Sequence, residues 1–114
     1  MNIYPITDEN GILKSFEIDM WEAGPKCISK FIENDIGGKI IERRKWFSGS
    51  EVHLKFLYRE NEFLIWEPFG DNSRYMICPA VDSKNDPNII LKIKDEFKNF
   101  RPGLKGIITG FLQL

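Results

Sequence analysis

Residues 39–79, KIIERRKWFSGSEVHLKFLYRENEFLIWEPFGDNSRYMICP, are the stretch that decides the fold. Apolar and polar residues alternate along it, and turn-forming residues interrupt the alternation at 48–50, 60–61 and 69–72. A period of two is typical of strands that bury one face, and short turns join antiparallel neighbours. The stretch therefore predicts a four-stranded antiparallel meander.

The turns also predict which residues face each other. A two-residue turn at 60–61 places Tyr58 opposite Phe63, and a four-residue turn at 69–72 places Trp66 opposite Tyr75. Residues directly opposite in an antiparallel pair share a face. We therefore expect one face to be the core side, covered by helices. Its residues are Ile40, Trp46, Val52, Leu54, Phe56, Tyr58, Phe63, Ile65, Met76 and Cys78.

The opposite face of the predicted meander combines apolar, aromatic and basic side chains. A three-residue turn at 48–50 places Arg43 opposite Lys55, a mildly unfavourable pairing of like charges. A protein partner would explain this basic cluster. Alternatively, lysine and arginine stems cover the aromatic rings of a solvated face. The residues expected on this face are Ile41, Leu57, Leu64 and Ile77 in one row, and Arg43, Lys55, Trp66 and Tyr75 in the next, with Lys45, His53 and Arg59 nearby.

The segments outside the meander predict one further strand and two helices. Residues 15–20 alternate as a half-buried strand, and a helix follows between Gly24-Pro25 and Gly37-Gly38. A second amphipathic helix starts at Asp86-Pro87 and stops at 101–103. The apolar segment 106–114 is expected to be a last strand or a docked segment. The order β-α-β-β-β-β-α predicts an α+β fold, with one antiparallel sheet and two helices mainly on one face.

Composition favours one domain spanning residues 1–114. The chain has 42% hydrophobic residues, enough for one core, and a formal net charge of -1, which gives no global field for nucleic acid or a membrane. No apolar run approaches the roughly 20 residues that cross a bilayer, and the N-terminus lacks the pattern of a signal peptide. We expect a cytoplasmic protein, in which Cys27 and Cys78 are buried thiols rather than a disulfide or a metal site.

The sequence contains no recognisable catalytic, metal-binding or cofactor-binding motif. His53 is the sole histidine, and no carboxylate that would orient it is apparent. Glu17, Asp19 and Glu22 form an acidic patch that we expect to be a solvated face, not a catalytic carboxylate pair. The glycines at 103–106 lack the Gly-Lys-Ser/Thr ending of a phosphate loop. We assign no catalytic residue, metal or cofactor.

Trp46, Trp66 and the turn WEPFG at 66–70 lie within an aromatic-rich meander, in a compact α+β layout without a catalytic constellation. In this layout the chain resembles the small cytoplasmic immunity proteins of bacterial polymorphic-toxin and contact-dependent growth inhibition systems. The resemblance implies a protein that binds one toxin domain tightly and blocks its active site or substrate path. It implies neither an enzyme nor a cofactor.

Binding to another protein is therefore the first functional hypothesis. Two regions of opposite charge are the expected contacts, and they predict partners of opposite charge. The alternatives are a single-stranded nucleic-acid binder that uses the same sheet face, a small enzyme or ligand-binding domain, and a subunit of a larger assembly. The near-neutral net charge argues against nucleic acid. The candidate contact residues are Arg43, Lys45, Lys55, Trp66 and Tyr75 in the basic region, and Glu17, Asp19 and Glu22 in the acidic one.

Overall fold

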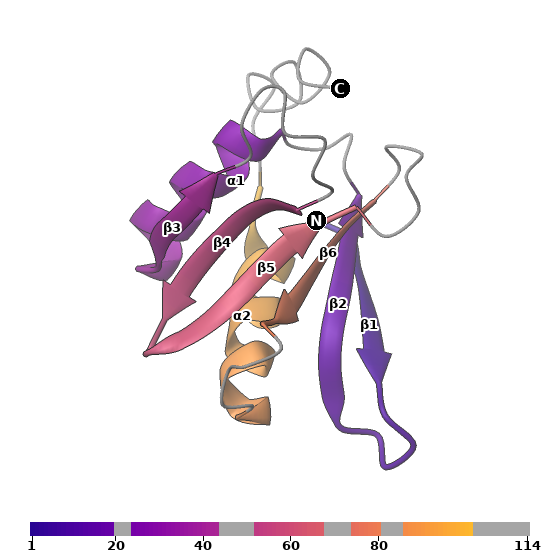
Figure 1. Ribbon diagram of the computed structural model, residues 1–114. Helices are drawn as coiled ribbons and strands as arrows, with labels where there is room; N and C mark the ends of the chain where they lie inside the picture. Colours follow the sequence, from indigo (N-terminus) through magenta and orange to yellow (C-terminus); the bar gives the residue numbers. More distant parts are fainter. Residues whose placement is uncertain (20–23, 44–51, 68–73, 81–85, 102–114) are drawn as a thin grey trace.

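A computed structural model describes residues 1–19, 24–43, 52–67, 74–80 and 86–101 (Figure 1). They form one six-stranded sheet in the order β1-β2-β6-β5-β4-β3, with every neighbouring pair antiparallel. The elements are β1 (Ile3–Thr7), β2 (Leu13–Asp19), α1 (Pro25–Phe31), the π-helical turn η2 (Ile32–Ile36), β3 (Lys39–Arg43), β4 (Val52–Tyr58), β5 (Asn61–Trp66), β6 (Arg74–Pro79) and α2 (Pro87–Asn99). The predicted α+β class and the order β-α-β-β-β-β-α are confirmed.

One strand, β1, precedes the predicted order. It pairs with β2 at the edge of the sheet, and three of its five residues are exposed. Its apolar alternation is short and contains Pro5, which cannot donate to a ladder and is tolerated on edge strands. The sequence therefore contains little signal for this strand, which places Tyr4 beside Glu17 of β2.

The predicted helix boundaries are confirmed at both helices. Pro25 occupies the first turn of α1, and η2 ends at Gly37, whose φ of 83° lies in the left-handed region that favours glycine. The Asp86 side chain accepts a hydrogen bond from the backbone N–H of Asn88 at 2.9 Å, which caps α2. These local signals fix where each helix begins and ends.

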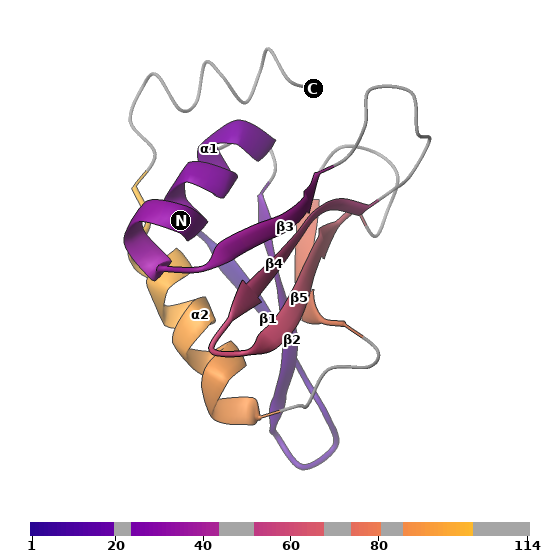
Figure 2. The same cartoon turned by 60° about the vertical axis from the view of Figure 1, so that its left-hand side comes forward.

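Both helices lie on the same side of the sheet (Figure 2). Helix α2 packs mainly against β2, whereas α1 contacts β4 and η2 contacts β3. The Phe97 ring lies 5.6 Å from the Phe16 ring and 5.0 Å from the Phe31 ring, so it joins α2 to both the sheet and α1. The core residues are Phe16, Ile18, Ile28, Phe31, Ile32, Leu54, Phe56, Tyr58, Phe63, Ile65, Tyr75, Ile77, Ile90, Ile93 and Phe97.

Several expectations fall outside the described residues. They concern Met20, Trp46 and the segment 106–114, which is expected to be a last strand or a docked segment. Within the described part of the chain, neither helix has the length and apolar character needed to cross a membrane.

Candidate interaction face of the sheet

The pairing of β5 with β6 decides which side chains share a face. Ile65 lies opposite Ile77 and Trp66 lies opposite Met76, one residue away from the predicted register. A shift by one residue moves every side chain of a strand to the other face. Tyr75 is therefore in the core with 2% of its surface exposed, and the prediction that it shares a surface with Trp66 is wrong. Conversely, Met76 and Cys78 leave the core side where they were expected.

The hairpin of β4 and β5 keeps the predicted faces but not the predicted turn. Tyr58 lies opposite Asn61, so the two-residue turn is at Arg59 and Glu60, one residue earlier than expected. Both turn residues have positive φ, 49° and 65°. The Asn61 side chain donates a hydrogen bond to the Arg59 carbonyl at 2.8 Å, which ties the start of β5 to the turn.

A bulge in β3 removes the predicted like-charge pair. The register skips Ile41, so Lys55 lies opposite Glu42 and its Nζ is 3.3 Å from the Glu42 carboxylate. Arg43 lies opposite the core residue Leu54, and its guanidinium pairs with Glu33 of η2 at 2.9 Å. The expected pairing of Arg43 with Lys55 is therefore wrong, and each cation has its own carboxylate.

A second bulge, at His53, corrects the expectation that this histidine has no carboxylate to orient it. The register skips His53, whose Nε2 lies 2.5 Å from Glu67 Oε1, and both side chains are nearly buried. The imidazole also contacts the ring of Tyr75 edge-on at 5.4 Å. Burial, together with the Glu67 charge, raises the pKa of Tyr75 above its usual range. Within the described residues, no hydrogen bond reaches the Tyr75 hydroxyl.

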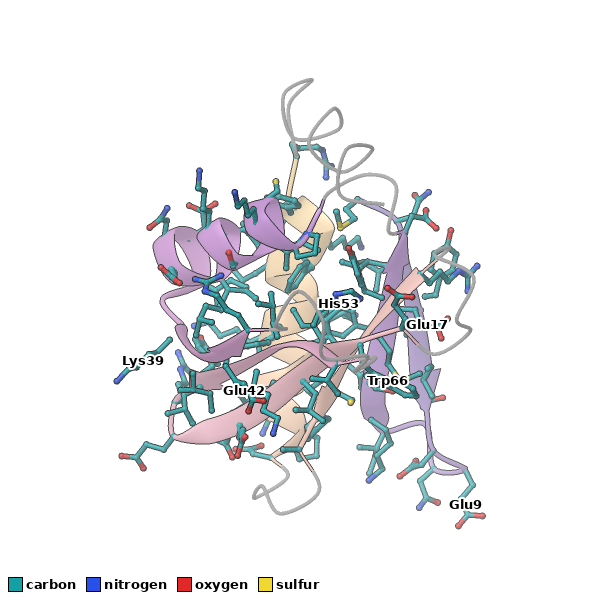
Figure 3. The ribbon with its side chains drawn as sticks, turned by 45° about the horizontal axis from the view of Figure 1, so that its top comes forward. Glu9, Glu17, Lys39, Glu42, His53 and Trp66 are labelled. Carbon is teal, nitrogen blue, oxygen red and sulfur yellow. The ribbon has the colours of Figure 1, made fainter. Side chains whose placement is uncertain are left out.

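The face opposite the helices, which we call the helix-free face, carries an apolar centre. Among the described elements, no helix packs on it (Figures 1 and 2). In Figure 3, Trp66 and Glu42 lie in front of the strands while α2 lies behind them. Two rows cross the sheet from β1: Ile6, Ser15, Cys78, Leu64, Lys55 and Glu42 in one, and Tyr4, Glu17, Met76, Trp66 and Val52 in the next, with Asp19 and Arg74 beyond the second row on β2 and β6.

The middle of these rows consists of half-buried apolar, aromatic and sulfur-containing side chains. Leu64, Trp66, Met76 and Cys78 adjoin one another there, each partly exposed. Burial raises the pKa of the Cys78 thiol, and a hydrogen bond with the Trp66 side chain partly opposes that shift. Cys27, the other cysteine, lies on α1, and neither cysteine forms a disulfide.

The acidic residues of β2 are not the solvated patch that the sequence predicted. Glu17 is 6% exposed, and its Oε1 accepts a hydrogen bond from Arg74 Nη1 at 3.0 Å. The Arg74 guanidinium stacks 3.6 Å from the centre of the Tyr4 ring, and the Tyr4 hydroxyl donates to Asp19 at 3.1 Å. The hydrogen bond to Glu17 is the main reason why the pKa of Arg74 is raised. These partners come together because β1, which the sequence did not predict, places Tyr4 beside β2, and because the register of β6 differs from the predicted one by one residue.

No family model, curated protein or solved structure matches this chain. Within the described residues, no group of three or more histidine, cysteine or acidic side chains is arranged to hold a metal ion.

The structure brings together only part of the predicted contact set. Lys55, Trp66, Glu17 and Asp19 share the helix-free face. Arg43 and Tyr75 lie on the helix-covered side, and Lys45 and Glu22 are outside the described residues. Met76 and Arg74 belong to the face but were missed, because only the true β5–β6 register reveals them.

Proposed function

We propose that this chain is a non-catalytic protein-binding module that uses its helix-free face. Its most concrete form is an immunity protein that binds and neutralises a cognate bacterial toxin domain. The observation that carries the proposal is the half-buried apolar centre of that face, Leu64, Trp66 and Met76, flanked on both sides by ion pairs. An apolar centre with a polar surround is the usual anatomy of a protein interface.

The size and rigidity of the face support a protein partner rather than a small ligand. Six adjacent strands span about 24 Å at about 4.8 Å per strand, which suits a partner domain. The centre is held on strands β5 and β6, whose opposite sides are locked in the core by Ile65 and Ile77. Tryptophan and arginine are the residues that most often dominate binding energy, and Trp66 and Arg74 adjoin Met76.

The same geometry gives less support to binding of single-stranded nucleic acid. Tyr75, one of the two aromatic platforms expected for base stacking, is buried in the core. Lys55 and Arg74 of this face are paired with Glu42 and Glu17, so they offer fewer free cations for phosphates.

A growth-protection assay tests the proposal. The product of the gene adjacent to its own is expressed in a sensitive bacterium with and without this chain, and survival is counted. We expect the chain to restore growth, and Trp66→Ala to abolish protection although the purified variant still unfolds cooperatively above the growth temperature. Leu91→Ala is the control, because Leu91 is an apolar residue that is exposed on α2, away from the helix-free face. No protection by the unmodified chain, or equal loss in both variants, would contradict the proposal.

A further inference from the structure

We infer that the partner presents a cationic side chain, arginine or lysine, to the Asp19 end of the helix-free face. The inference rests on the proposed function and deepens it, because it assigns the charge of the partner's contact surface. The sequence leaves two opposite possibilities open, a partner that meets the basic residues or one that meets the acidic residues. The geometry of the described residues favours the second.

The basic residues of the expected contact region are already neutralised within the chain. Lys55 pairs with Glu42, and Arg43 pairs with Glu33 on the other side of the sheet. An acidic partner would have to compete with these carboxylates, and the two cations do not even share a face. At the β3 and β4 end of the helix-free face, Lys55 is thus already neutralised within the chain.

At the other end of the face, the described residues include more carboxylates than cations. Glu17 and Asp19 adjoin a single guanidinium, Arg74, which is bonded to Glu17. Asp19 accepts only the Tyr4 hydroxyl among the described residues, although a carboxylate can accept about four hydrogen bonds. Asp19 is half-buried, so its charge is only partly screened by water. An additional donor with a positive charge would satisfy it.

The buried hydroxyl of Ser15, on the same strand, also has no hydrogen-bond partner among the described residues. Ser15 projects on the same face as Glu17 and is 7% exposed. Among the residues that the structure describes, no hydrogen bond reaches its hydroxyl, whereas buried polar groups are nearly always paired. Ser15, Glu17 and Asp19 therefore form a polar stripe along β2 with fewer partners than it can accept. One guanidinium or ammonium group supplies several donors to Asp19. Ser15 lies about 13 Å away along β2, so a separate group of the partner would meet it.

The test measures affinity for the purified product of the adjacent gene, inactivated in its toxic site, by calorimetry at low and high salt. Asp19→Asn keeps an acceptor for Tyr4 but removes the charge. Asp95→Asn is the matched control, because Asp95 is an exposed aspartate on α2, on the opposite side of the sheet. Thermal melts of both variants check that the fold is intact.

We expect Asp19→Asn to weaken binding at least about tenfold and to reduce its salt dependence, and Asp95→Asn to change affinity less than about twofold, as for a charge outside the interface. Equal effects of the two variants, or tighter binding by Asp19→Lys, would overturn the inference. If Trp66→Ala weakens binding but Asp19→Asn does not, only the charge assignment fails. If the unmodified chain does not bind, the proposed function fails as well.

Discussion

The two faces of the sheet use the same strands for different purposes. On the helix-covered face, Phe16, Ile65 and Ile77 are at most 1% exposed and belong to one core cluster with residues of α1 and α2. On the helix-free face, Leu64, Trp66 and Met76 alternate with them along the strands and remain partly exposed. The difference teaches that β2, β5 and β6 are fixed from one side, so their other side can hold a contact surface without contributing much to stability.

The largest expected difference comes from matched truncations on the two sides. Phe97→Ala removes a fully buried ring and should lower the free energy of unfolding by about 3–5 kcal/mol. Leu64→Ala, on the helix-free face, should cost about 1 kcal/mol, because its side chain is already partly hydrated. Urea denaturation measures both. Equal losses would mean that the helix-free face is as tightly packed as the core.

The two faces are also expected to differ in how much an ion pair contributes to stability, as Glu67 and Glu42 can show. Glu67→Ala leaves the nearly buried His53 without its partner and should cost about 1–3 kcal/mol. Glu42→Ala removes a pair whose carboxylate side chain is 64% exposed, and should cost less than about 1 kcal/mol. A double-mutant cycle of Glu67 with His53 isolates the first pair. The contrast is lost if the cycle gives no coupling.

Two tyrosines provide a smaller contrast. Tyr75→Phe removes a buried hydroxyl that has no hydrogen bond among the described residues, so stability should stay unchanged or rise by up to about 1 kcal/mol. Tyr4→Phe removes the donor to Asp19 and should cost about 1 kcal/mol. A clear destabilisation by Tyr75→Phe would mean that its hydroxyl is satisfied.

The pH dependence of the same variant checks this environment. Because the pKa of Tyr75 is higher in the folded than in the unfolded chain, its neutral form is favoured by folding. Its contribution is complete below the ordinary phenol pKa of about 10 and is lost as pH rises above it. Melting temperatures measured from pH 8 to 11 should therefore fall less steeply for Tyr75→Phe than for the unmodified chain.

The smallest effect concerns the turn that sets the faces of β4 and β5. Glu60 has a φ of 65°, a conformation that glycine adopts without steric cost. Relief of the left-handed conformation outweighs the greater flexibility that glycine has in the unfolded chain. Glu60→Gly should therefore raise the free energy of unfolding by a net amount of about 0.5–1 kcal/mol. Urea denaturation of the variant and the unmodified chain under the same conditions measures this difference. A loss of stability would mean that Glu60 is not strained in this turn.

The sequence predicted the fold better than the surface. Alternation, Pro25, Gly37 and the Asp86 cap are local signals, and local signals are enough to predict strands and helix ends. The bulges at Ile41 and His53 contain no glycine or proline that would mark them. Each bulge reverses the side to which the residues beyond it point, so the faces of Arg43 and Val52 were predicted wrongly although their strands were predicted correctly. The one-residue shift in the β5–β6 register had the same effect on Tyr75 and Met76.

The burial of Glu17 could not be predicted for a different reason. Its partners come from β1, which the sequence signals weakly, and from β6, whose register was one residue away. Long-range pairing therefore decides whether an acidic residue on a strand is solvated or neutralised. Trp66 was placed correctly, because its own hairpin keeps its faces even though the turn moved by one residue.

A methyl NMR titration tests the central claim most directly. The three methionines are labelled with ¹³C at the methyl group, Met76 is assigned through Met76→Leu, and the purified product of the adjacent gene is added. Met76 lies at the centre of the helix-free face, between Glu17 and Trp66. We predict that its resonance shifts and saturates at one equivalent of partner. Formation of a complex in which the Met76 resonance does not move would contradict the account.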